Sequence, residues 1–245
     1  MRAVASMVAE LDGTATRLAV LRSEPPLLLR HTPAAAGPAT VYLLGGAAGP
    51  LGGDELRVEI VVGEGASLWV QGIAASVALP SAPSEPSRLT VTASVADGAE
   101  LRWLPEQLIA AQGCQHLSSS YLDLGTGSRL LWREELVLGR HGESPGDVTV
   151  TMSLTRAGKP LLRQALQAGP RAPHWDGPGV LDGAKVVGCL IGVGVPGYRP
   201  DESAVWMPLP GSIGTQWLVT ATASGAARLR AALTPAPRGK PVGLP

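Results

Sequence analysis

Residues 89–103 read LTVTASVADGAELRW and contain the pattern from which the fold class can be inferred. In its first seven residues apolar and polar side chains alternate, which is typical of a strand that buries one face. Gly98 then offers a turn, after which Leu101 and Trp103 resume an apolar pattern with a period of two. The stretch therefore predicts two strands joined by a glycine turn.

The same unit recurs on both sides of this stretch. Residues 65–69 (GASLW), 98–103 (GAELRW) and 127–132 (GSRLLW) share a glycine, a small residue, a leucine and a tryptophan, with the glycines 33 and 29 residues apart. Stacking such units would bury a continuous core. Ordinary turn chemistry explains the pattern equally well, so the repeat alone leaves both interpretations open. As a fold class we expect elongated, stacked β layers, either β-helix-like or a two-layer sheet.

Other segments extend the β pattern. Apolar and polar residues alternate at 56–60 and 148–154. Residues 156–159 predict a hairpin turn, with Pro160 opening the return strand on an edge or at its first position. No break in the pattern suggests a domain boundary, so we expect one β domain over residues 1–245.

One helix is expected near the C-terminus, with a second short helix allowed elsewhere. Residues 226–233 place two leucines on one face, Ser224 can cap the first turn, and Arg228 and Arg230 are expected in solvent. After it, residues 234–245 are rich in proline and predict a flexible tail.

Composition narrows the class of protein. The chain has 31 glycines and 22 prolines, and its 20 basic residues balance its 20 acidic residues. A neutral chain has no net field to attract nucleic acid or anionic lipid, so neither is expected as a partner. Two cysteines are too few for a disulfide framework, which fits a reducing cytoplasm.

Several short motifs match known cofactor-binding or catalytic patterns but lack the neighbouring residues or elements that those sites require. Residues 192–197 match a dinucleotide-binding glycine pattern, but prolines disfavour the helix that should follow. Residues 142–146 match a nucleophile elbow, yet a proline replaces the residue whose N–H would bind an oxyanion. Cys114 and His116 could share one face of a strand and bind a soft metal, although a buried cysteine beside a hydrogen-bonded histidine is the favoured interpretation.

Three segments together resemble one family. Residues 49–56 (GPLGGDEL), 101–109 (LRWLPEQLI) and 132–143 (WREELVLGRHGE) are similar, in this order and spacing, to motifs of the urease accessory protein UreD, also called UreH. The family motif has Gln-Glu where this chain has Glu106-Gln107. On a strand, that exchange would move the carboxylate to the other face.

The resemblance implies a β-rich, non-catalytic scaffold that assembles with UreF, the GTPase UreG and apo-urease. It implies that nickel passes along an internal path, so no cofactor is expected to bind tightly and Ni²⁺ would bind transiently. Candidate ligands in this path are the carboxylates inside the matched motifs, Asp54, Glu106, Glu134 and Glu135. From spacing alone, Arg133 and Arg140 are expected to neutralise the last two.

Two rival functions remain open at this level. A β-rich carbohydrate-active or ester-cleaving enzyme would use some of the six tryptophans as sugar platforms and two facing carboxylates for glycoside cleavage. Against it, three tryptophans recur at repeat positions, which predicts core filling. A structural adaptor without a metal path is the third interpretation.

Overall fold

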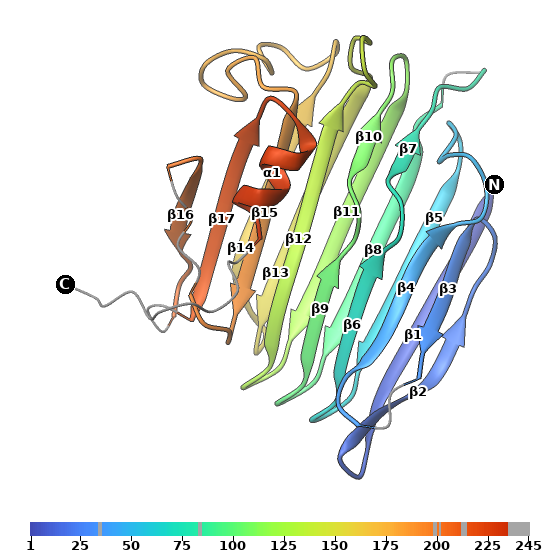
Figure 1. Ribbon diagram of the computed structural model, residues 1–245, viewed down its shortest axis with the longest axis vertical. Helices are drawn as coiled ribbons and strands as arrows, with labels where there is room; N and C mark the ends of the chain where they lie inside the picture. Colours follow the sequence, from blue (N-terminus) through green and yellow to red (C-terminus); the bar gives the residue numbers. More distant parts are fainter. Residues whose placement is uncertain (34–35, 83–84, 198–199, 201, 212–214, 235–245) are drawn as a thin grey trace.

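The computed structural model describes residues 1–33, 36–82, 85–197, 200, 202–211 and 215–234. Within these residues the strands form one seven-stranded and one ten-stranded sheet. Figure 1 shows them as layers of long strands that advance across the molecule from the N-terminal to the C-terminal part of the chain. The expected mainly β fold with stacked layers is confirmed.

Each strand of the seven-stranded sheet has eight to eleven residues. Its members are β1 (Arg2–Asp12), β2 (Ala15–Arg22), β5 (Glu55–Val62), β8 (Ser87–Val95), β11 (Gln115–Leu124), β13 (Asp147–Arg156) and β14 (Lys159–Ala168). They lie in the order β14-β13-β11-β8-β5-β1-β2. The five central strands are parallel, and the outer pairs β1–β2 and β13–β14 are antiparallel.

The ten-stranded sheet faces the first. Its members are β3 (Leu27–Thr32), β4 (Ala39–Gly45), β6 (Ser67–Gly72), β7 (Ser76–Ala78), β9 (Glu100–Leu104), β10 (Leu108–Ala110), β12 (Arg129–Leu138), β15 (Val186–Val193), β16 (Ala204–Pro208) and β17 (Gln216–Ala223). The main path runs β16-β17-β15-β12-β9-β6-β4-β3, and β10 pairs with both β12 and β7 beside it.

The repeated unit is an arch between the two sheets. β5, β8 and β11 each lead through a glycine turn into β6, β9 and β12 of the other sheet. Gly65, Gly98 and Gly127 have φ values of 69°, 66° and 68°, a left-handed conformation that a side chain disfavours. The two interpretations of the glycine pattern, a structural repeat and ordinary turn chemistry, therefore both hold. The unit does repeat, and in each repeat the chain passes from one sheet to the other through a turn that requires glycine.

Strand register sets which tryptophans enter the core. Trp103 and Trp132 are register partners on β9 and β12, both buried, and their rings stack. Trp69 instead aligns with Arg102, whose guanidinium carbon lies 4.3 Å from the indole centroid. The expectation that all three repeat tryptophans fill the core is wrong for Trp69. Its unit has one residue fewer between leucine and tryptophan, and a shift of one residue reverses the face of a strand.

The hairpin at residues 156–159 is confirmed. Ala157 and Gly158 both have positive φ, at 48° and 73°, as a two-residue primed turn between antiparallel strands requires. Pro160 lies on β14, which is an edge strand of the seven-stranded sheet. Its missing N–H therefore removes no hydrogen bond from the interior of the sheet.

The helix α1 (Ala226–Ala232) covers the ten-stranded sheet on its outer side. Gly225 occupies the N-cap and no side chain caps the first turn, so the predicted Ser224 cap is wrong. Leu229 and Leu233 are fully buried, and a Cβ on Gly188 of β15 would lie only 2.8 Å from a methyl carbon of Leu233. Glycine at that position lets the helix lie close to the sheet. Residues 235–245 of the expected tail are outside the described part of the chain.

Among the described residues, no helix has the length and apolar character that a bilayer span requires.

Candidate functional site

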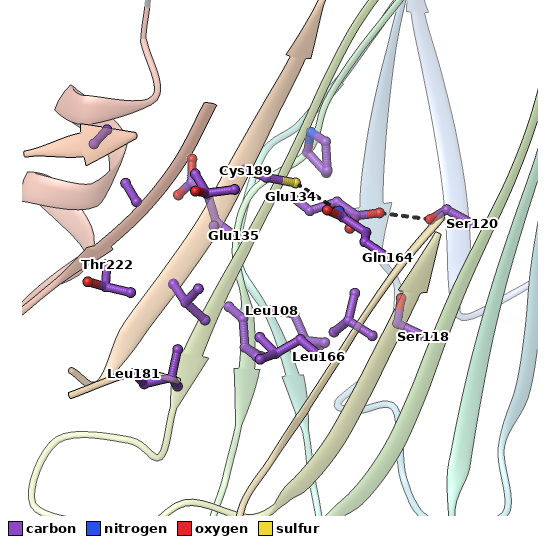
Figure 2. Close-up of a pocket in the computed structure, with 18 of the residues that line it drawn as sticks. Leu108, Ser118, Ser120, Glu134, Glu135, Gln164, Leu166, Leu181, Cys189 and Thr222 are labelled. Carbon is purple, nitrogen blue, oxygen red and sulfur yellow. Dashed lines mark hydrogen bonds between the residues drawn. The ribbon is translucent and has the colours of Figure 1, made fainter. Parts of the chain in front are cut away.

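A cavity of about 480 Å³ lies between the two sheets. Trp103 borders it, and most of its other lining residues belong to later strands of the chain. The seven-stranded sheet contributes Ser118, Ser120 and Gln164, and the ten-stranded sheet contributes Glu134 and Cys189. Figure 2 shows Ser120, Glu134, Gln164 and Cys189 near one part of the space, with Ser118, Leu108 and Leu166 along another. The walls are mostly apolar with a few polar groups, as in small-molecule and ion sites.

Glu134 extends into the cavity from β12. Ser120 Oγ donates a hydrogen bond to Glu134 Oε1 at 2.8 Å, and Trp132 Nε1 donates to the same oxygen at 3.1 Å. Burial raises the pKa of Glu134, while the bonds from Ser120 and Trp132 oppose that shift. Because both donors use Oε1, the other carboxylate oxygen is open to a ligand in the cavity.

Cys189 lies beside Glu134 as its direct partner across β12 and β15. Gln164 Nε2 lies 3.5 Å from the sulfur, and Figure 2 shows the pair spanning the two sheets. Burial, with the charge of Glu134 adding to it, raises the pKa of Cys189 to about 12. The thiol is therefore neutral at pH 7, and oxygen atoms are the principal donors here.

Glu106 and Glu135 also border the cavity, but each forms ion pairs with arginine. The Glu135 side chain points to the α1 side of the sheet, opposite to Glu134, because Glu135 pairs with Gly188, against which Leu233 of α1 packs. Arg230 of α1 forms a bidentate pair with Glu106 at 3.0 and 2.9 Å, and its Nε bonds to Glu135. The hydrogen bond from Arg230 lowers the pKa of Glu106, against the effect of burial. Arg133 Nε lies 2.9 Å from Glu135 Oε1, although the geometry is poor for a hydrogen bond. The second oxygen of Glu135 is buried and has no hydrogen-bond partner.

A smaller cavity of about 80 Å³ adjoins the first. The two share lining residues, among them Trp103, Glu106 and Leu108. His116 lines the smaller cavity: its Nδ1 lies 2.8 Å from Ser87 Oγ, and its buried Nε2 has no partner. Burial lowers the pKa of His116 to about 4, so the ring is neutral at pH 7.

These side chains are separate donors along one interior space. Within the described residues, no group of three or more histidine, cysteine, aspartate or glutamate side chains is placed to hold a metal ion.

Comparison with known proteins identifies the family. A family model described as "UreD urease accessory protein" matches residues 1–236. The chain belongs to the UreD family. It is 45% identical to the urease accessory protein UreD of Streptomyces avermitilis, with 95% of each chain covered, and 44% identical to that of Streptomyces coelicolor, with 94% of this chain and 93% of the relative covered. It is 39% identical to UreD of Parafrankia sp., with 94% and 86% covered.

The residues matched by the UreD family model include all four carboxylates predicted as nickel ligands. In the structure, three of the four lie at the cavity and the fourth lies elsewhere. Glu106, Glu134 and Glu135 line the same cavity. Asp54 lies away from it, where its Oδ1 accepts a hydrogen bond from the amino group of Met1 at 2.7 Å and its Oδ2 accepts one from the Leu51 amide at 2.9 Å. In this UreD chain, Asp54 therefore closes a turn and binds the N-terminus.

Sequence reasoning missed Arg230 and Gln164. Arg230 was expected in solvent, but its side chain is only 28% exposed and is fully engaged by carboxylates. The pairing of Arg140 with the β12 carboxylates is also wrong, since Arg140 binds Glu143. Residues 105–107 lie between β9 and β10 rather than on a strand, so the exchange at Glu106 and Gln107 does not reverse a strand face. No pattern in the sequence linked these distant positions.

Proposed function

We propose that this chain is a maturation scaffold that binds apo-urease and, with UreF and UreG, supports delivery of nickel to the urease active site through the cavity between its sheets. Family membership supports the role in urease maturation. The observation that carries the nickel path is that Glu134 extends into the cavity between the sheets and Glu106 borders the same cavity from the segment between β9 and β10.

The donor set suits passage of an ion. Carboxylate, hydroxyl and amide oxygens from Glu134, Ser120 and Gln164 can replace part of the water shell of a divalent cation. A cage of thiolates and imidazoles would hold the ion too tightly to release it. The volume of about 480 Å³ also accommodates a cation that keeps several waters.

The larger and the smaller cavity share lining residues, so the interior space extends beyond Glu134. Trp103, Glu106 and Leu108 border both cavities, so an ion leaving the larger one would pass Glu106 and approach His116. The neutral imidazole offers a nitrogen donor of the kind that nickel accepts. Successive weak sites of this kind favour movement of an ion over storage.

Reconstituted activation tests the proposal. Purified apo-urease, UreF, UreG and this chain are incubated with Ni²⁺, and urease activity is measured together with the nickel content of the isolated urease. The Glu134→Gln variant should lower both by about tenfold or more, because it removes the charge of a direct ligand and a tenfold loss requires only about 1.4 kcal/mol. Glu143→Gln is the matched control, since Glu143 lies in the same motif but binds Arg140 outside the cavity.

The adaptor function is the alternative outcome of this experiment. Normal urease activity with Glu134→Gln, Glu106→Gln and Glu135→Gln in turn, combined with no activation when the chain is omitted, would leave a scaffold without a metal path. Full activation without the chain would reject the scaffold itself.

A further inference from the structure

Arg230 joins α1 to two carboxylates at the border of the cavity, Glu106 and Glu135. Its guanidinium contacts both oxygens of Glu106 and one oxygen of Glu135, and these partners are 124 and 95 residues away in the chain. We infer that α1 is a latch: Arg230 keeps Glu106 and Glu135 from binding a divalent cation while α1 is docked, and releases them as ligands when a partner protein displaces the helix. This inference rests on the proposed function, and it adds control of the same cavity by α1.

The docked arginine blocks cation binding at Glu106. Both oxygens of that carboxylate face the guanidinium at 3.0 and 2.9 Å, so a cation would have to displace it or lie a few ångströms from it. Two like charges at such a distance repel strongly when little water separates them. Arginine remains protonated throughout the physiological pH range, so only a movement of Arg230 can remove the block.

Glu135 shows that the site is poised to accept a ligand. Its side chain is 1% exposed, and Oε1 accepts a hydrogen bond from Arg230. Arg133, on β12 itself, lies 2.9 Å from the same oxygen and would stay there when α1 leaves. Oε2 is buried without a hydrogen-bond partner. A buried acceptor without a partner is destabilising, so this oxygen gains more than an exposed one from a bound cation.

The helix can move because little of its stability is its own. α1 has seven residues and no side-chain cap. Isolated helices shorter than about 12–15 residues are marginal in water, so contacts with the sheet must hold α1 in place. Leu229, Leu233 and the ion pairs of Arg230 are those contacts.

A partner surface with an apolar groove for Leu229 and Leu233 and a carboxylate for Arg230 would compete for all of these contacts at once. Glu106 lies between β9 and β10 and borders both cavities. Displacement of α1 would therefore free ligands at the point where the larger cavity meets the smaller one. Docking of the partner and loading of the path would then be coupled.

Direct nickel binding tests the latch without urease. Binding of NiCl₂ to the full-length chain is measured by isothermal titration calorimetry for the native protein, Arg230→Ala and Arg228→Ala. Arg228 is exposed on the same helix, so its variant changes the net charge equally and controls for it. Arg230→Ala should bind Ni²⁺ about tenfold more tightly or more, which is within the usual range of coupling between sites, and Arg228→Ala should match the native protein.

A second set of variants separates the latch from general loosening. Adding Glu106→Gln and Glu135→Gln to Arg230→Ala should remove the gain in affinity. Unchanged or weaker nickel binding by a folded Arg230→Ala protein, or a gain that survives the two glutamine substitutions, would overturn the latch. If Arg230→Ala fails to fold, Arg230→Gln decides, because glutamine removes the positive charge, still offers a hydrogen-bond donor to the carboxylates, and should therefore tighten binding measurably. No gain with glutamine would then count against the latch.

The latch and the proposed function fail separately. Unchanged nickel binding by Arg230→Ala, together with reduced urease activation by Glu134→Gln, would remove the latch and leave the path. Tighter nickel binding by Arg230→Ala, with normal activation by all three cavity variants, would keep the latch and remove delivery through the cavity.

Discussion

The indole rings of Trp103 and Trp132 stack with centroids 5.1 Å apart and planes 17° from parallel. The pair lies on neighbouring parallel strands of the ten-stranded sheet, one repeat apart. Trp132 also donates Nε1 to Glu134, so the same side chain fills the core and orients a cavity carboxylate. The wall of the cavity is therefore fixed by the packing that stabilises the fold.

Replacing Trp132 with alanine should destabilise the protein by about 3–5 kcal/mol, because the change removes a fully buried aromatic ring and leaves a void. Urea denaturation followed by circular dichroism measures the loss. Trp69→Ala is the control: Trp69 lies outside the core under Arg102, and its cation–π contact contributes only about 0.5–1 kcal/mol. Equal losses for the two variants would contradict the assigned strand faces.

Gly98→Ala tests the arch between the sheets. A Cβ at Gly98 meets no atom within 4 Å, so the cost arises only from its φ of 66° and should be about 1–2 kcal/mol. Gly179→Ala is a matched control, because it is also open on all sides and its φ is not positive. Thermal unfolding of both proteins should show a lower midpoint for Gly98→Ala alone. A drop of the same size in the control would indicate that conformation is not the cause.

His116 should make the protein less stable in mild acid. Burial lowers its pKa from 6.5 to about 4 in the folded state. Below pH 6.5 the unfolded chain binds a proton that the folded chain does not, so the free energy of unfolding falls as pH drops from 6.5 towards 4. The loss over this window should be about 3 kcal/mol, since one pKa unit corresponds to about 1.4 kcal/mol.

Urea denaturation at pH 7, 6, 5 and 4 measures that slope. His116→Gln should be less stable at pH 7, because glutamine fills the site imperfectly, but its stability should change less between pH 6.5 and 4. His141→Gln, at an exposed position, should keep the native slope. Identical slopes for all three proteins would show that His116 does not titrate between the two states.

Cys189 should react before Cys114 in the folded protein. Burial raises the pKa of Cys114 to about 11 and that of Cys189 to about 12, so both are slow towards thiol reagents at pH 7. Only Cys189 lines the cavity, which a small reagent can enter. Timed treatment with methyl methanethiosulfonate, followed by peptide mass spectrometry, should find Cys189 modified first. Modification of Cys114 first would show that the cavity is closed to reagents of this size.

The sequence predicted the family correctly but predicted the residues of the site only in part. Residues 101–109 and 132–143 carry motifs that placed Glu106, Glu134 and Glu135 among the candidates, and these three line one cavity. Asp54 lies in an equally specific motif, yet it binds the N-terminus. A motif shows that residues belong together in a family, whereas it does not show which way a side chain points after a turn.

Sequence rules that consider only neighbouring residues also gave wrong predictions at three positions. Ser224 is a good N-cap residue by type, but the chain places Gly225 at the cap. Arg230 is a typical solvent residue of a helix, but tertiary packing brings it against two carboxylates. Trp69 follows the repeat by composition and departs from it by one position, which turns its ring away from the core.

What the sequence determined alone was the β architecture, since alternation with a period of two and glycines at the bends act over a few residues. Strand faces and arches follow from backbone geometry and need no distant partner. The tertiary structure alone decided that carboxylates from β12 and from the β9–β10 segment share one cavity and that Arg230 holds two of them. Those relationships depend on how layers stack and where a short helix docks, and the free energy of both comes from contacts between residues far apart in the chain.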